Sequence, residues 1–140
     1  MSEALEQRLA VLETEVKELK DQEAIREMIH RYCQAVDRCD LEMLKSCYWE
    51  DGYDDHGFFA GNAHQFAEYV IPCLEQVDSS MHSITNTRFK FDGDRCACAS
   101  QWAVTHRLAH DGASPISCTR VVTLMYGKSG KVSGNCCMVS

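Results

Sequence analysis

The sequence has no long apolar run, no Gly-rich phosphate-binding loop and no secretory leader pattern at its N-terminus. A helix that crosses a membrane needs about 20 consecutive apolar residues, so we expect no membrane partner and a cytoplasmic location. The glycines fall outside the GxGxxG and GxxxxGKS patterns that hold nucleotide phosphates. The sequence therefore indicates no cofactor.

A basic cluster is also missing. The chain carries 14 Lys and Arg residues against 21 Asp and Glu residues, for a net charge of -7. Nucleic-acid-binding proteins neutralise phosphates with clustered Lys and Arg, so we expect no nucleic-acid partner. Acidic residues gather near the N-terminus, where we interpret them as the solvated face of a helix.

The nine cysteines include no Cys-x-x-Cys pair. Cys96 and Cys98 share a face of a predicted strand, and Cys136 and Cys137 are adjacent, so neither pair has the spacing typical of a zinc site. In a cytoplasmic protein we expect reduced thiols that pack as small hydrophobic residues. The last four residues also fit a prenylation box, but stable anchoring takes two lipid signals.

The 140 residues contain no linker or repeat, which predicts one domain spanning residues 1–140. Residues 1–22 are an expected helical extension, because its apolar residues follow the alternating spacing of a coiled-coil seam. These residues are Leu5, Leu9, Leu12, Val16 and Leu19. The seam is too short for a stable free coiled coil. We expect it to pack on another subunit, giving a homo-oligomeric dimer or trimer, or back on its own domain.

Helical spacing of apolar residues continues to Val36, which predicts one helix from Ser2, as N-cap, to about Cys39. Asp40 is the expected N-cap of a short second helix that ends at about Tyr48.

Further along the chain, an extended piece is expected at 53–59 and a third helix at 63–76. Pro72 predicts a kink or an early end of that helix.

From residue 80 the apolar period changes to two, which is typical of strands. Strands are expected at 81–91, 95–109, 116–126 and, weakly, 131–139, with turns at 92–94, 110–112 and 127–130. The Asp-Gly step at 92–93 is a strong hairpin signal. Helices followed by an antiparallel meander predict an α+β domain with helices on one face of a curved sheet.

Three polar residues make a complete proton-transfer set that needs no metal: Tyr32, Asp37 and His82. Tyr32 and Asp37 lie near the end of the predicted first helix, and His82 lies on a predicted strand. Residues at i and i+5 are about 140° apart around an ideal helix, so spacing alone does not place Tyr32 and Asp37 on one face. Core packing of Tyr32 and helix termination at Asp37 remain alternatives.

Six segments together resemble the SnoaL-like branch of the nuclear-transport-factor-2-like superfamily. They are residues 23–32, 37–40, 48–51, 54–57, 80–86 and 92–97. The N-terminal helix is particularly similar to that of the bile-acid 7α-dehydratase group. The resemblance implies a cone-shaped curved antiparallel sheet packed against the N-terminal helices, the cystatin-like α+β roll, with a pocket between them.

In the bile-acid dehydratases a Tyr-x-x-x-x-Asp pattern on the first helix acts with a histidine on a later strand, and Tyr32, Asp37 and His82 fall at those positions. The resemblance implies a cofactor-independent dehydratase-type lyase for a hydrophobic cyclic or polycyclic small molecule, such as a steroid or polyketide. His82 would be the general base, Asp37 its orienting carboxylate, and Tyr32 the acid or carbonyl-polarising group. An isomerase, cyclase or dehydrohalogenase using the same pair, and a non-catalytic ligand-binding or dimerisation module, are alternatives.

Seven more residues are expected to line the pocket. They are His56, Phe59, Phe66, Ile84, Asn86, Trp102 and His106. His56 fits the pocket mouth or the cap of a turn equally well, whereas for His106 a hydrogen-bonded core position is favoured over the pocket. We expect the other three histidines, His30, His64 and His110, at the surface.

Asp54, Asp55 and His56 could be imagined as metal ligands. Successive strand residues point to opposite faces, however, so we expect no metal site there.

Residues 113–140 depart from the family, whose two closing strands usually carry aromatic and charged residues and a late Trp. We expect atypical C-terminal strands here. One hypothesis is that a shifted reading frame after Arg120 produces this tail, and sequencing the gene tests it.

Overall fold

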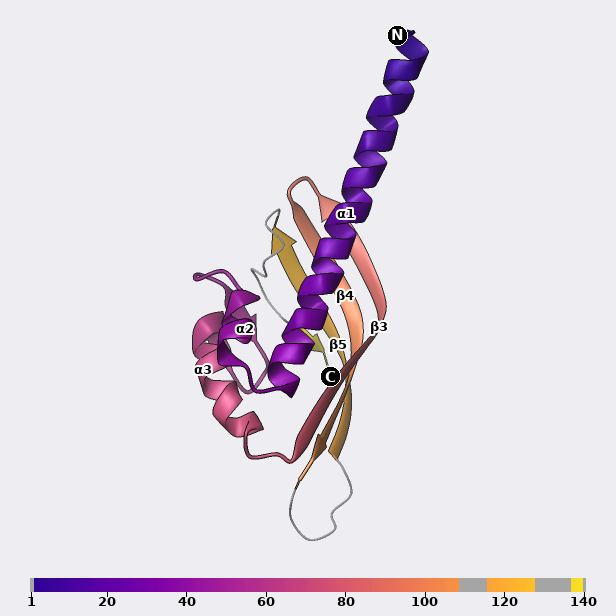
Figure 1. The fold of residues 1–140 in the computed structure, drawn as a ribbon. Helices are drawn as coiled ribbons and strands as arrows, with labels where there is room; N and C mark the ends of the chain where they lie inside the picture. The colour runs from indigo at the N-terminus through magenta and orange to yellow at the C-terminus, as the bar shows by residue number, and fades with distance from the viewer. Residues whose placement is uncertain (1, 109–115, 128–136, 140) are drawn as a thin grey trace.

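The computed structural model describes residues 2–108, 116–127 and 137–139. Three helices and a short hairpin precede the strands of an antiparallel sheet, which confirms the predicted α+β class (Figure 1). The helices are α1 (Glu3–Asp37), α2 (Leu41–Ser46) and α3 (Ala63–Leu74). The strands are β1 (Tyr53–Asp55), β2 (Ala60–Asn62), β3 (Ser79–Asp92), β4 (Arg95–Arg107), β5 (Ile116–Gly127) and β6 (Cys137–Val139). The described strands form a curved sheet in the order β3-β4-β5-β6 and a separate β1-β2 hairpin.

Helix α1 is continuous over 35 residues, as its apolar spacing predicts. Ser2 is the N-cap residue, as predicted, although its carbonyl oxygen and not its hydroxyl accepts from the backbone N–H groups of Leu5 and Glu6. The N-terminal half of α1 extends away from the sheet (Figure 1). Leu9, Leu12 and Val16 stay 45%, 52% and 47% exposed there. The seam therefore does not pack back on its own domain, and its packing on another subunit stays a prediction.

Cys39 ends α1 with a positive φ of 54°, and the backbone N–H of Asp40 then bonds to the carbonyl oxygen of Ala35 at 2.9 Å. The Asp40 carboxylate accepts from the backbone N–H of Met43, which confirms the predicted cap of α2. Helix α2 ends at Ser46, slightly earlier than predicted. This tight connection turns the chain and leaves Asp37 in the last turn of α1.

A hairpin replaces the single extended piece expected at 53–59. Strand β1 pairs with β2, with Asp54 opposite Gly61. The turn forms because the Asp55 carboxylate accepts from the N–H of Gly57 at 2.8 Å, and Gly57 adopts a φ of 79°, a conformation that costs glycine little. This turn places His56 directly after β1.

Helix α3 starts at Asn62, whose side chain accepts from the backbone N–H of His64 at 2.9 Å. It contains Pro72 and ends at Leu74, close to the predicted early end. Strands β3 and β4 form the hairpin that the Asp-Gly step predicts, with Gly93 at a φ of 55°. The turn expected at 110–112 and most of the weak last strand lie outside the described residues.

The core lies between the sheet and the helices. It includes Ile25, Ile29, Cys33, Val36, Leu44, Phe66, Ala67, Ile71, Cys96, Cys98 and Trp102. Cys96 and Cys98 are buried, as predicted for small hydrophobic side chains, whereas Cys73 is exposed. In the described part of the chain, no helix combines the length and the apolar character needed to cross a membrane.

Candidate active site

Asp37 and His82 form a close pair where α1 crosses β3. The imidazole Nδ1 of His82 lies 2.6 Å from Oδ1 of Asp37. The backbone N–H of His82 donates to Oδ2 at 3.0 Å, and the Ser80 hydroxyl donates to Oδ1 at 3.1 Å. An ionised carboxylate only accepts hydrogen bonds, so the proton of the pair lies on Nδ1. The lone pair of neutral His82 is then on Nε2.

The position of Asp37 is locally unfavourable, because a carboxylate in the last turn of a helix meets the negative end of the helix dipole. Burial also opposes its ionisation. The hydrogen bonds from the His82 side chain and backbone outweigh burial and lower the pKa of the Asp37 carboxyl below its ordinary value of 3.8. Strand β3 thus supplies the donors that keep this carboxylate ionised.

A cavity of about 350 Å³ reaches the pair. Ligand sites in proteins start at about 300 Å³, so it has room for a small molecule. Its lining consists of His30, Cys33, Gln34, Asp37, Arg38, His82 and Ile84. Of the residues expected to line the pocket around the proton-transfer set, Ile84 lies here. The cationic Arg38 gives this cavity a more polar wall than the sequence suggested.

Strand β4 brings Trp102 and His106 to His82. The ring of His82 meets the edge of Trp102 at a centroid distance of 6.4 Å and that of His106 at 6.0 Å. Burial and the charge of His82 lower the pKa of His106. Within the described residues, the buried Nδ1 of His106 has no hydrogen-bond partner. His106 is therefore not the hydrogen-bonded core histidine that the sequence favoured.

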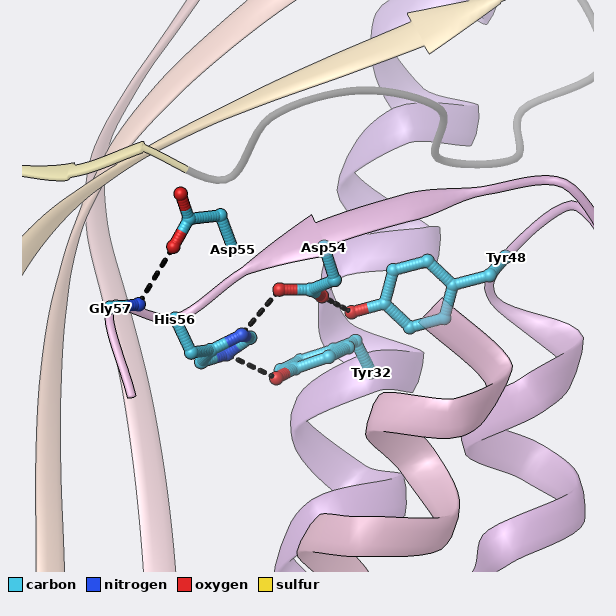
Figure 2. Close-up of polar contacts among 6 residues, drawn as sticks. All are labelled: Tyr32, Tyr48, Asp54, Asp55, His56 and Gly57. Carbon is cyan, nitrogen blue, oxygen red and sulfur yellow. Dashed lines mark hydrogen bonds and ion pairs between the residues drawn. The ribbon is translucent and has the colours of Figure 1, made fainter. Parts of the chain in front are cut away.

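Asp54 and His56 form a second Asp–His pair (Figure 2). His56 Nδ1 donates to Oδ1 of the buried Asp54, whose Oδ2 accepts from the Tyr48 hydroxyl. On its other side, His56 Nε2 lies 3.2 Å from the hydroxyl oxygen of Tyr32. The hydrogen bonds thus run from Tyr48 through Asp54 and His56 to Tyr32, which we call the Tyr48–Tyr32 chain.

Aromatic packing holds the Tyr48–Tyr32 chain in place. The His56 ring stacks on Phe66 at a centroid distance of 4.0 Å and an interplanar angle of 14°. The Tyr32 ring meets the edges of Tyr48 at 6.2 Å and of Trp102 at 5.4 Å. Trp102 therefore contacts both Tyr32 and His82 and connects the two Asp–His pairs.

Two predicted pocket residues remain, Phe59 and Asn86, and they lie in different places. Phe59 packs on Phe66 at a centroid distance of 5.5 Å, near His56. Asn86 lies apart from the others. Strand pairing shifts between Thr85 and Arg88, and Asn86 has a φ of 54° and points its exposed side chain to Gln101. The strand alternation that assigned Asn86 to the pocket fails at this bulge.

The surface positions of the other histidines are partly confirmed. His30 is exposed, but His64 is half-buried, and its Nε2 has no partner in the part of the chain that the structure describes. His110 lies outside that part. Among the described residues, no group of three or more His, Cys, Asp or Glu side chains is arranged to hold a metal ion.

The sequence reasoning missed Tyr48, Asp54 and Ser80. A signal existed for Asp54, because residues at i and i+2 of a strand point the same way, and His56 follows Asp54 at that spacing. Ser80 likewise shares the alternation of His82 on β3. Tyr48 carried no such signal, since it meets Asp54 only through the turn that follows α2.

Comparison with known proteins agrees with this architecture. Residues 17–129 match the family model of the SnoaL-like domain. No curated protein gives a significant match.

Solved structures share the fold at low sequence identity. A predicted scytalone dehydratase from Novosphingobium aromaticivorans is 15% identical, with a TM-score of 0.75 over 88% of this chain and 87% of that chain. The LinA-type3 hexachlorocyclohexane dehydrochlorinase from Novosphingobium barchaimii is 21% identical, with a TM-score of 0.76 over 90% and 91%. An NTF2-like protein with a cystatin-like fold from Novosphingobium aromaticivorans is 22% identical, with a TM-score of 0.73 over 85% and 79%.

Proposed function

This chain belongs to the SnoaL-like family, and we propose that it is a cofactor-independent lyase of the dehydratase type. The observation that carries the proposal is the bond between His82 Nδ1 and the Asp37 carboxylate. It leaves the lone pair of His82 on Nε2, which is the arrangement a general base needs. The similar folds that are described as a dehydratase and a dehydrochlorinase support the same reaction class.

The proposed elimination balances without a metal. Nε2 of His82 takes a proton from a substrate carbon, and the electron pair of that C–H bond forms a C=C bond. The C–O bond of the substrate breaks, and the leaving hydroxide receives a proton and departs as water. Asp37 stabilises the imidazolium that forms on His82, while Tyr32, which like His82 contacts Trp102, supplies the proton to the leaving oxygen.

The presence of Tyr32 favours dehydration over dehydrohalogenation as the reaction that the Asp37–His82 pair catalyses. Hydroxide is a poor leaving group and needs a proton donor, whereas chloride leaves without one. A donor phenol in contact with Trp102, and linked to its own Asp–His pair, fits the first reaction. We propose a hydrophobic cyclic or polycyclic alcohol as substrate, with hydroxysteroids of the kind that the bile-acid 7α-dehydratase group uses as the first compounds to test.

The test is a screen of steroids that carry a hydroxyl group β to a carbonyl, because the conjugated C=C product absorbs in the ultraviolet. We expect dehydration by the wild type, its loss in His82→Ala, and an unchanged rate in Ser83→Ala, a control at the exposed neighbouring position of β3. Equal rates for wild type and His82→Ala would contradict the proposal. Binding of these steroids without turnover would support a ligand-binding module instead.

A further inference from the structure

Asp54 is the one fully buried charged residue in the described part of the chain, with 1% of its surface exposed. A buried carboxylate is costly unless its oxygens receive hydrogen bonds. Both oxygens do so here, from the Tyr48 hydroxyl and from His56 Nδ1. These hydrogen bonds have no part in the proposed roles of Asp37 and His82, so we asked what Asp54 and His56 could do.

The acceptors of Asp54 decide where the His56 proton lies. Because an ionised carboxylate has no hydrogen to donate, the hydrogen between Asp54 and His56 belongs to Nδ1. This fixes one nitrogen in every charge state of His56. Only Nε2, 3.2 Å from the Tyr32 oxygen, can gain or lose a proton.

The state of Nε2 decides what Tyr32 can offer to a substrate. When His56 is neutral, Nε2 carries a lone pair, and the single phenol hydrogen of Tyr32 is donated to it. When His56 is protonated, Nε2–H donates to the Tyr32 oxygen, and the phenol hydrogen can be donated to a substrate instead of to His56. One proton on His56 thus converts Tyr32 from an acceptor into a donor toward a substrate, while toward His56 it changes from donor into acceptor.

We propose that the Asp54–His56 pair is the proton supply of Tyr32, and this inference rests on the proposed function because it completes the acid half of that elimination. As the C–O bond breaks, the Tyr32 hydrogen passes to the leaving oxygen and the Nε2 hydrogen of His56 passes to the Tyr32 oxygen. Water leaves, Tyr32 is a phenol again, and His56 is neutral. His82 later releases its proton to solvent, and His56 takes one up, which closes the balance.

The surroundings of His56 suit this role. Its side chain is 13% exposed, and Phe66 from α3 covers one ring face. Among the described residues, His56 contacts the titratable groups of Asp54 from β1 and Tyr32 from α1, while its aromatic neighbours Phe58 and Phe66 are uncharged. Tyr32 is therefore the proton acceptor that the geometry offers to His56 Nε2. His56 acts through Tyr32, so it is a positioning residue.

The first measurement needs no substrate and no variant. Side-chain nitrogen NMR of the wild type reports which imidazole nitrogen of neutral His56 carries the hydrogen. We expect Nδ1–H, the form that the Asp54 carboxylate imposes. Neutral His56 with its hydrogen on Nε2 would overturn the inference.

The second measurement is a double-mutant cycle on the steroid that the wild type dehydrates fastest. His56→Gln keeps an N–H donor but has no proton to transfer, so we expect kcat to fall by about 10²-fold or more with KM little changed. His64→Gln is the matched control and should leave kcat unchanged. Combined with Tyr32→Phe, His56→Gln should cause no further loss, because both act on one step.

Multiplicative losses in the double variant, or an unchanged kcat in His56→Gln, would overturn the inference while His82→Ala still reports on the proposed function separately. A wild type that dehydrates none of the steroids overturns both.

Discussion

His82 Nδ1 lies 2.6 Å from Oδ1 of Asp37, although 45 residues separate them in the sequence. Asp37→Asn places an amide N–H group against Nδ1 and favours the hydrogen on Nε2, where the imidazole can no longer accept a proton. We expect a loss of about 10²- to 10⁴-fold in kcat, measured by steroid dehydration. Glu42→Gln makes the same charge change at an exposed position of α2 and should retain full activity. A fully active Asp37→Asn protein contradicts this role.

The Asp37 carboxylate also makes the free energy of unfolding depend on pH. Burial opposes its charge, but hydrogen bonds from His82 lower its pKa in the folded protein below the ordinary 3.8. A lowered folded-state pKa contributes stability that is present above about 3.8 and is lost as the pH falls through the folded value. The difference in the free energy of unfolding between wild type and Asp37→Asn, measured in urea, should therefore shrink as the pH falls below this point. A difference that stays constant with pH speaks against the prediction.

Thiol labelling should separate buried from exposed cysteines. Burial raises the pKa of Cys33 and of Cys98 to about 12, and the thiolate is the reactive form. Cys73 is exposed. We expect an alkylating reagent to modify Cys73 in the native protein and to reach Cys98 only on unfolding, as located by peptide mass spectrometry. Rapid native labelling of Cys98 would show that the core is more open than described.

The exposed seam of α1 predicts self-association. A soluble protein rarely leaves a row of large apolar side chains in water, and Leu12 is 52% exposed. A charge there should disfavour a partner helix, so Leu12→Glu is expected to lower the mass measured by light scattering. Thr14→Glu, on the opposite side of the helix, is the matched control. An oligomeric state unchanged by Leu12→Glu would leave the seam without this role.

Local signals in the sequence predicted much of the fold. The 3.6-residue spacing specified α1, Asp40 capped α2, and the Asp-Gly step specified the β3–β4 hairpin. The β1–β2 hairpin was not predicted, because its turn depends on one hydrogen bond, from the backbone N–H of Gly57 to the Asp55 carboxylate. The position of Asn86 escaped for a similar reason, since a bulge reverses strand alternation without a compositional sign.

The site was predictable only in part. The resemblance to the SnoaL-like family proposed Tyr32, Asp37 and His82 as one set, and the structure brings Asp37 and His82 together. Tyr32 instead bonds to His56, while both Tyr32 and His82 contact Trp102. Helical spacing had indicated that Tyr32 and Asp37 diverge around α1. Which partner each would meet depends on tertiary contacts that no local pattern encodes.

The central claim is that His82 takes the substrate proton, and chemical rescue tests it most directly. The measurement is the rate of steroid dehydration by His82→Ala with and without added imidazole. The account predicts that removing the base lowers the rate by about 10²- to 10⁴-fold and that free imidazole, bound in the vacated space beside Asp37, restores part of it. A His82→Ala protein that dehydrates as fast as the wild type without imidazole would contradict the account.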